Sequence, residues 1–306
     1  MWKKAFLRCV VLRGFRVGHR EDLRLATGCT VFLFDVPNVA VASVCGGAPG
    51  SRELPTLFPG RLVPGVDAIV LSGGSAFGLR CSEGVVTFLR ERKRGFATRT
   101  TPVPIVAQAV IYDLEVGEVA FPEAEWGYEA ALRADTTVRE GTVGVGTGAT
   151  VGKKFGMQWA MKGGFGASEV RLPEGSIWAF VVTNALGDVY DPKSGTLLAG
   201  SRGENAERAS FPSFNTTLAV VIFELSLLRE ELLALASLVH SALATCIRPF
   251  GTLYDGDVLF LVALGKKQPK DYLLLVQGVY EAVTEAVINS VKKASPLCGI
   301  PSCITQ

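Results

Sequence analysis

The sequence is poor in histidine, with only His19 and His240 among its 306 residues. His240 stands in an apolar segment typical of a helix, where a packed core side chain is expected. His19 stands in a glycine-containing turn predicted over 14–19 and is expected to be structural. A Ser-His-Asp or Cys-His pair is therefore poorly supported, and a histidine-rich metal site is not available.

Other features that mark particular protein classes are also missing. The seven cysteines are an odd number without C-x-x-C spacing, which favours reduced thiols over a disulfide framework or a zinc site. The net charge of +2 gives no particular attraction to nucleic acid. The longest uncharged apolar stretch, 232–247, is shorter than the ~20 residues of a membrane helix. Arginines interrupt the apolar run near the start, so we expect no secretory signal and a cytoplasmic location.

What is present is enough apolar sequence for a large core. Hydrophobic residues make up 48% of the chain and charged residues 20%, and no Ser/Pro-rich or charged linker divides it. We therefore expect a single domain over 1–306. Strands are predicted at 28–34, 39–44, 66–71, 103–112, 177–183, 217–223 and 258–264, and helices at about 80–92, 122–133, 227–247 and 271–293. The first two strands read as a β-hairpin, and the segregated runs of strands and helices indicate α+β layers.

Two glycine-rich segments suggest anion binding. The segment 72–79 follows a strand and opens a helix, a place where free N–H groups suit an oxyanion or a carboxylate. The segment 141–154 invites a phosphate interpretation, but its spacing is wrong. A Walker loop needs glycine at Thr147 and Ser or Thr at Lys154, and no G-x-G-x-x-G register fits.

The shortage of histidine leaves one nucleophilic solution that needs none. An N-terminal Thr, Ser or Cys can use its own α-amine, with a reference pKa near ~8, as the base. An internal residue acquires this role only after the preceding peptide bond is cut. The Asn215–Thr216 step, directly before a strand predicted at 217–223, has the necessary residue types, although most such polar turns are only turns.

Seven motifs carry a resemblance to a known family. They resemble, in the same order, motifs of the self-processing L-aminopeptidase/D-esterase family, which includes the β-peptidyl aminopeptidases, and they span about residues 10–265. These motifs are Gly46-Gly47-Ala48-Pro49-Gly50, the segment 71–79, Gly148-Ala149-Thr150-Val151-Gly152-Lys153, Lys162-Gly163-Gly164, the segment 184–188, the segment 215–221 and Asp255-Gly256-Asp257.

The resemblance implies an α/β/β/α sandwich of the N-terminal-nucleophile hydrolase kind, also seen in ornithine acetyltransferases. It implies one precursor that cleaves itself between Asn215 and Thr216 into segments 1–215 and 216–306, with Thr216 as the nucleophile. It implies a peptide or amino-acid-derivative substrate and a homo-oligomer. We expect no cofactor, no metal, and no nucleic-acid or membrane partner.

The resemblance also assigns site residues. Asn184 matches a side-chain donor of the oxyanion hole, where losing one donor typically costs ~3 kcal/mol of transition-state stabilisation. Asp255 and Asp257 match polar residues beside the nucleophile, and Asp257 could anchor an amine by charge pairing. Tyr112 matches a site tyrosine of the family. The segment Ser72-Gly73-Gly74-Ser75 is expected to line the substrate cleft.

One departure and two alternatives remain. After Val221 the family usually continues Ala-Thr-Asp-Ala, whereas this chain has Ile222-Phe223-Glu224-Leu225, which puts the shape of the substrate pocket in doubt. One alternative is an acyltransferase of the ornithine acetyltransferase type, which passes the acyl group to an amine. The other is an unprocessed, inactive relative that only binds amino-acid-like ligands.

Overall fold

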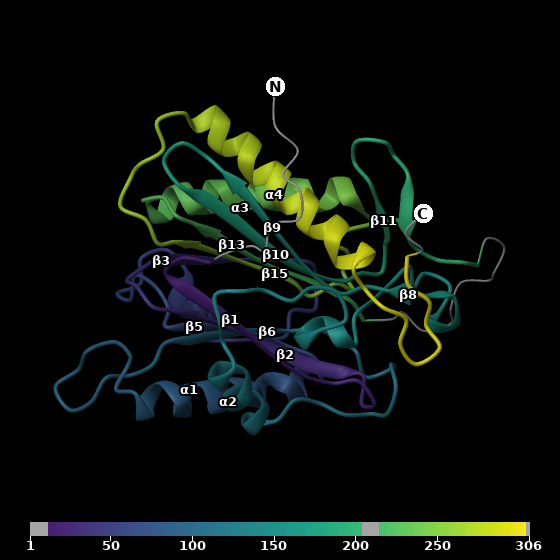
Figure 1. Ribbon diagram of the computed structural model, residues 1–306, viewed down its shortest axis with the longest axis horizontal. Coiled ribbons are helices and arrows are strands. Elements are labelled where there is room, and N and C mark those ends of the chain that lie inside the picture. The colour runs from purple at the N-terminus through teal and green to yellow at the C-terminus, as the bar shows by residue number, and fades with distance from the viewer. Residues whose placement is uncertain (1–11, 204–213, 304–306) are drawn as a thin grey trace.

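The computed structural model describes residues 12–203 and 214–303 and has four layers, with two β-sheets between two pairs of helices (Figure 1). Within these residues, both large sheets are five-stranded. The first sheet has the order β1 (Phe15–Asp22), β2 (Thr27–Phe34), β5 (Ala68–Ser72), β6 (Val106–Val110) and β4 (Ser51–Arg52). The second has the order β3 (Val39–Cys45), β15 (Asp257–Ala263), β13 (Thr216–Phe223), β10 (Ser176–Asn184) and β9 (Phe165–Arg171). This arrangement is the α+β, α/β/β/α sandwich that the resemblance implies.

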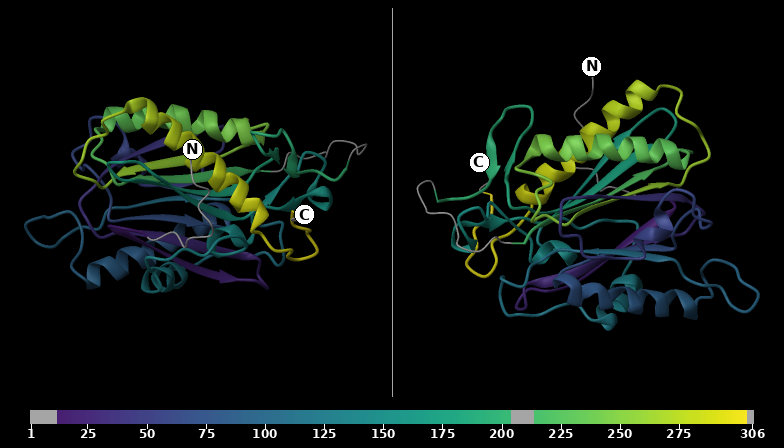
Figure 2. Two further views of the ribbon diagram at one scale, coloured as in Figure 1. Left: turned by 45° about the horizontal axis from the view of Figure 1, so that its top comes forward. Right: turned by 180° about the vertical axis from the view of Figure 1, so that it is seen from behind.

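The helices cover the outer faces of the sheets (Figure 2). Helices α1 (Cys81–Glu91) and α2 (Ala124–Leu132) lie on the first sheet, and α3 (Arg229–Cys246) and α4 (Tyr272–Lys292) on the second. These four helices agree with the predicted ranges to within a few residues. No helix in the described part of the chain is both long and apolar enough to cross a membrane.

Shorter elements complete the fold near the ends of the large sheets. They are the strands β7 (Thr150–Val151), β8 (Met161–Lys162), β11 (Asp188–Tyr190), β12 (Leu197–Ala199) and β14 (Ile247–Arg248), and the 3-10 helices η1 (Leu54–Leu57), η2 (Ser75–Arg80), η3 (Gly144–Thr147) and η4 (Met157–Trp159).

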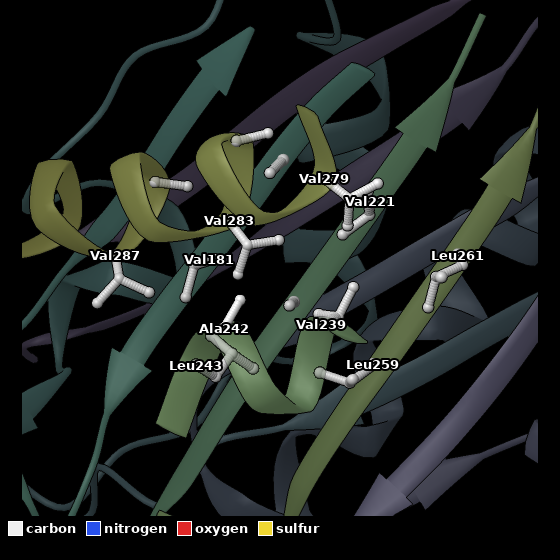
Figure 3. Close-up of a cluster of buried hydrophobic side chains, with 14 of the residues drawn as sticks. Val181, Val221, Val239, Ala242, Leu243, Leu259, Leu261, Val279, Val283 and Val287 are labelled. Carbon is white, nitrogen blue, oxygen red and sulfur yellow. The ribbon is translucent and has the colours of Figure 1, made fainter. Parts of the chain in front are cut away.

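Strand β13 shows why the central strands are apolar throughout. Its side chains alternate between two cores, with Leu218, Val220 and Ile222 facing the first sheet and Val221 and Phe223 facing the helices. A strand with both faces covered gains from an unbroken apolar run, at roughly 25 cal/mol per Å² of buried apolar surface. The core on the helix side brings together side chains of β10, β13, β15, α3 and α4 (Figure 3).

Two local predictions are wrong. The strands on either side of 35–38 do not form a hairpin, because β2 pairs with β1 and β5 in the first sheet while β3 pairs with β15 in the second. The connection therefore crosses from one sheet to the other. The turn predicted over 14–19 is largely strand β1, whose His19 pairs with Thr30 of β2.

The topology brings three strand ends together. Because β10 and β13 are antiparallel, Asn184 at the end of β10 pairs with Thr216 at the start of β13. Because β13 and β15 are parallel, Asp257 at the start of β15 also lies at this edge. A parallel bridge between Asn215 and Asp255 extends the pairing. Residue 184 and residues 255–257, some seventy positions apart in the sequence, thus lie on either side of the start of β13.

Candidate active site

The Thr216 hydroxyl lies against the carbonyl group of the residue before it. Thr216 Oγ1 donates a hydrogen bond to the Asn215 carbonyl oxygen at 2.6 Å, and both residues are buried. The same oxygen accepts the Gly256 N–H at 2.9 Å. A hydroxyl group and a backbone donor therefore converge on one carbonyl oxygen. The hydroxyl lies beside the Asn215–Thr216 peptide bond, and the N–H is placed to stabilise negative charge on that oxygen.

Two glycine motifs hold the donor in place. The Ala48 N–H donates to the Asp255 carbonyl oxygen at 3.0 Å, which packs the 46–50 loop against the 255–257 turn. A Cβ atom on Gly256 would lie 2.4 Å from the Ala48 carbonyl oxygen and 3.1 Å from Thr216 Oγ1. Only a residue without a side chain lets the Gly256 N–H approach the Asn215 carbonyl this closely.

The side-chain amide of Asn184 is held from both ends. Its Oδ1 accepts the Thr150 N–H at 3.1 Å and Lys153 Nζ at 2.9 Å, and its Nδ2 donates to the Tyr112 carbonyl oxygen at 3.0 Å. Asn184 is fully buried. These contacts set the direction of the amide, and one of the two Nδ2 hydrogens has no role in them.

Lys153 also belongs to this cluster. Its ammonium also donates to the Asn184 carbonyl oxygen at 3.2 Å. Burial lowers the pKa of Lys153 to about 7, against the opposing effect of the carboxylates of Glu115, Asp255 and Asp113. The lysine closes the glycine motif 148–153, so the signal was in the sequence, but nothing local showed that it reaches Asn184.

Two acidic residues flank Thr216 on its other side. Asp255 Oδ2 accepts the Thr252 N–H at 2.7 Å, and Asp257 Oδ1 accepts the Thr217 N–H. Asp257 Oδ2 is buried without a hydrogen-bond partner among the residues that the structure describes. Burial, reinforced by the charge of Asp255, raises the pKa of Asp257 to about 8. Asp257 is therefore largely protonated at neutral pH while the chain is intact.

Tyr112 faces the segment before the predicted cut. Its ring lies 5.8 Å from that of the exposed Phe214, between centroids, and burial raises the pKa of its phenol. Its backbone carbonyl, rather than its side chain, contacts Asn184.

The N–H groups of the predicted cleft segment have partners inside the protein. The Gly73 N–H donates to the Gly28 carbonyl, the Gly74 N–H to Asp113 Oδ1 at 2.6 Å, and the Ser75 N–H to the Ile111 carbonyl. Ser72 Oγ bonds the Gly78 carbonyl and is buried. The substrate-lining role of 72–75 stays a prediction.

The two histidines are engaged elsewhere. His19 Nδ1 bonds Thr30 Oγ1 at 2.9 Å, and burial lowers the pKa of His19 to about 4. His240 Nε2 bonds Ser43 Oγ at 3.0 Å, and burial lowers its pKa as well. In residues 12–203 and 214–303 no cluster of His, Cys, Asp and Glu has the form of a metal site.

Two cavities differ in their relation to this cluster. One of about 540 Å³ is lined by residues such as Arg13, Ser176 and Glu224, at the opposite end of β10 and β13 from Thr216. One of about 240 Å³ is lined by Glu115 and Met157, among others, and Met157 Sδ lies 4.0 Å from Thr150 Oγ1. Thr150 donates to Asn184, so the smaller cavity adjoins the cluster.

Comparisons with known proteins identify a family model and sequence relatives that match nearly the whole chain or most of it. Residues 11–302 match the family model of peptidase family S58. The chain is 36% identical to an uncharacterized aminopeptidase of Mycobacterium tuberculosis, with 94% of each chain covered. It is 31% identical to a 6-aminohexanoate-oligomer endohydrolase of Paenarthrobacter ureafaciens, covering 78% of this chain and 76% of that protein.

Solved structures share the fold. A β-aminopeptidase of Burkholderia sp. superposes with a TM-score of 0.72 at 21% identity, covering 96% of this chain and 91% of that one. An L-aminopeptidase D-Ala-esterase/amidase of Ochrobactrum anthropi, described as a variant of the Ntn hydrolase fold, gives 0.74 at 17% identity, covering 97% and 91%.

Proposed function

The chain belongs to peptidase family S58, and on that premise we propose that it is an aminopeptidase whose nucleophile, Thr216, is exposed when the chain cuts itself after Asn215. The observation that carries the proposal is the convergence of Thr216 Oγ1 and the Gly256 N–H on the Asn215 carbonyl oxygen. The substrates proposed are peptides, amino-acid amides and esters.

In the first stage the chain acts on itself. Thr216 Oγ attacks the Asn215 carbonyl carbon, and the Gly256 N–H stabilises the charge that develops on the carbonyl oxygen. The peptide C–N bond breaks, the hydroxyl proton ends on the departing nitrogen, and Asn215 is left as an ester on Thr216 Oγ. Water hydrolyses the ester, giving segments 1–215 and 216–306 with a free hydroxyl and a free α-amine on Thr216.

In the second stage the same hydroxyl acts on substrates. The α-amine accepts the Oγ proton as Oγ attacks the scissile carbonyl, and it then returns the proton to the leaving amine, so that an acyl-enzyme forms and water releases it. The Asn184 amide, held by Lys153 and the Tyr112 carbonyl, supplies one donor to the oxyanion. The Gly256 N–H supplies another once the Asn215 end has left.

An acidic group at the smaller cavity supports a substrate with a free amino group. Glu115 lines this cavity together with the cation Arg202, and the carboxylates of Glu115 and Asp255 both act on Lys153. A substrate ammonium bound on the Glu115 side would be attracted by that carboxylate.

Intact-mass measurement tests the proposal most directly. The purified protein should give two chains that end at Asn215 and begin at Thr216, whereas Thr216→Ala should stay one chain and be inactive. A two-chain product from Thr216→Ala would remove Thr216 from the mechanism. Thr217→Ala, one residue further along the same strand, is the matched control and should still be cut.

A substrate panel then separates the reaction classes. It should include aminoacyl amides, esters, short peptides and an oligomer of 6-aminohexanoate, since a relative is named for acting on the last. Adding an acceptor amine distinguishes hydrolysis from acyl transfer. Release of the free acid at the same rate with and without acceptor supports a peptidase. Turnover that depends on the acceptor would instead assign the protein as an acyltransferase.

A further inference from the structure

The carboxylate of Asp113 is buried beside the candidate active site and has no part in the mechanism above. Asp113 lies on the loop after β6 and is 3% exposed. Its Oδ1 accepts the Gly74 N–H at 2.6 Å and its Oδ2 accepts Thr27 Oγ1 at 2.8 Å. A buried carboxylate with both oxygens bonded is held in one position, because moving it would leave a charge without partners.

Two glycine motifs form the walls around this carboxylate. A Cβ atom on Gly73 would lie 2.2 Å from Asp113 Oδ2, and one on Gly148 would lie 2.3 Å from the same atom. Any side chain at either position would displace the carboxylate. Of the N–H groups expected to be free at the start of the 75–80 helix, that of Gly74 meets a carboxylate, and this carboxylate belongs to the protein itself.

The peptide bond between Tyr112 and Asp113 links the carboxylate to Asn184. The Tyr112 carbonyl accepts Asn184 Nδ2 at 3.0 Å, and the other end of the same peptide is the backbone of Asp113, whose side chain is anchored by Gly74 and Thr27. Because a trans peptide is planar, fixing its Asp113 end sets the direction of the carbonyl at its Tyr112 end.

We propose that Asp113 is a positioning residue for the reaction at Thr216: its anchored carboxylate orients the Tyr112–Asp113 peptide, whose carbonyl holds the side-chain amide of Asn184 toward the oxyanion. The inference rests on the proposed function for its kinetic consequence, but its structural consequence is independent of activity. Asp113 acts only through Asn184 and does not touch the reacting atoms.

Charges nearby are consistent with an ionised Asp113. Burial raises the pKa of Asp113 to about 6, while the Gly74 N–H, the Thr27 hydroxyl and the Lys162 ammonium oppose that rise. Lys162 is fully buried and donates to the Thr147 and Ala149 carbonyl oxygens, each at 2.7 Å. The carboxylate is thus mostly charged at neutral pH. Burial lowers the pKa of Lys162 to about 7, so Lys162 compensates the carboxylate only in its ammonium form.

The test is a double-mutant cycle on Asp113→Asn and Asn184→Ala. Asp113→Asn keeps the side-chain shape but loses the charge and one acceptor, so kcat for an aminoacyl amide should fall about 10- to 100-fold, with KM changed little, because a small misplacement of a catalytic group costs this much. In the Asn184→Ala background the same substitution should cost less than about 2-fold, because the group it positions is gone.

The controls separate positioning from general damage. Asp271→Asn removes the carboxylate that caps α4 by accepting the Leu273 and Leu274 N–H groups, far from Thr216, and should leave kcat unchanged. If Asp113→Asn does not fold, Thr27→Val removes one of the two anchors with little change of volume, and Thr27→Ser should restore kcat. An equal loss of kcat from Asp113→Asn in both backgrounds, or no loss in either, would overturn the proposal.

A crystal structure of Asp113→Asn gives the readout that does not depend on activity. The distance from Asn184 Nδ2 to the Tyr112 carbonyl oxygen should lengthen beyond hydrogen-bonding range, and an unchanged 3.0 Å contact would contradict the inference. If the wild-type protein hydrolyses nothing in the panel, the proposed function fails, and this distance still decides the role of Asp113.

Discussion

The stability of the uncut chain should fall with rising pH because of Asp257. The acid is 1% exposed, Thr217 donates to one of its oxygens, and burial together with Asp255 raises its pKa to about 8. In the unfolded chain an Asp titrates near ~3.9. Stabilisation by the protonated form is therefore complete below the unfolded pKa and is lost as pH rises toward the folded pKa.

The size of this effect follows from proton linkage. Between the two pKa values the unfolded chain is ionised and the folded chain is not, so each pH unit costs about 1.4 kcal/mol. From pH 6 to pH 8 the loss is about 2–3 kcal/mol, or about 4 °C in Tm for a chain of 306 residues. Asp257→Asn cannot ionise, so it should gain this much on the parent over that range, and the gain should level off above pH 8.

Thermal unfolding of the two proteins across pH 5–9 measures the difference. Both should carry Thr216→Ala to keep the chain intact. Asp191→Asn is the control, because hydrogen bonds from the Lys193 and Ser194 N–H groups lower the pKa of Asp191 and its contribution is constant over this range. A Tm difference between Asp257→Asn and the parent that stays flat from pH 6 to 8 would refute a protonated Asp257. In the cut protein the new α-ammonium of Thr216 should favour the Asp257 carboxylate, so the dependence should weaken there.

Three further substitutions test the packing and the site. Gly256→Ala should slow self-cleavage and lower Tm, since its Cβ would collide with a carbonyl oxygen 2.4 Å away; cutting at the wild-type rate, followed by intact mass, would show that the Gly256 N–H is not needed. Phe180→Ala, between the two sheets, should cost about 3–5 kcal/mol in denaturant unfolding, against less than about 0.5 for Leu253→Ala at the exposed surface. His240→Gln should keep kcat within about 2-fold and leave the acid limb of the pH–rate profile unchanged. The ring bonds Ser43, and burial lowers its pKa, so it is not the group that titrates in catalysis.

The sequence predicted the four α-helices of the described residues and seven of the ten strands in their two large sheets, because the apolar runs are long and end at clear breaks. It failed at 28–44, where two apolar strands separated by four residues have the form of a hairpin. Whether neighbouring strands pair depends on partners far along the chain, here β5 for one and β15 for the other. Local propensity carries no information about that choice.

The site was predictable to a different extent for each residue. The motifs selected Asn184, Thr216, Asp255 and Asp257, and the structure places all four at one edge of the second sheet. Lys153 was passed over, because a lysine at the end of a glycine-rich segment has the same local pattern whether it faces solvent or an amide.

The sequence by itself determined which chemistry the chain can use. It has only two histidines, a hydroxyl residue directly after an asparagine, and glycines where backbones must approach closely. These features depend only on residue type and order. Only the tertiary structure decided that the Gly256 N–H reaches the Asn215 carbonyl, that burial raises the pKa of Asp257 and that Gly73 and Gly148 enclose the Asp113 carboxylate. Hydrogen bonds and pKa values depend on burial and on groups distant in the chain, which no local pattern contains.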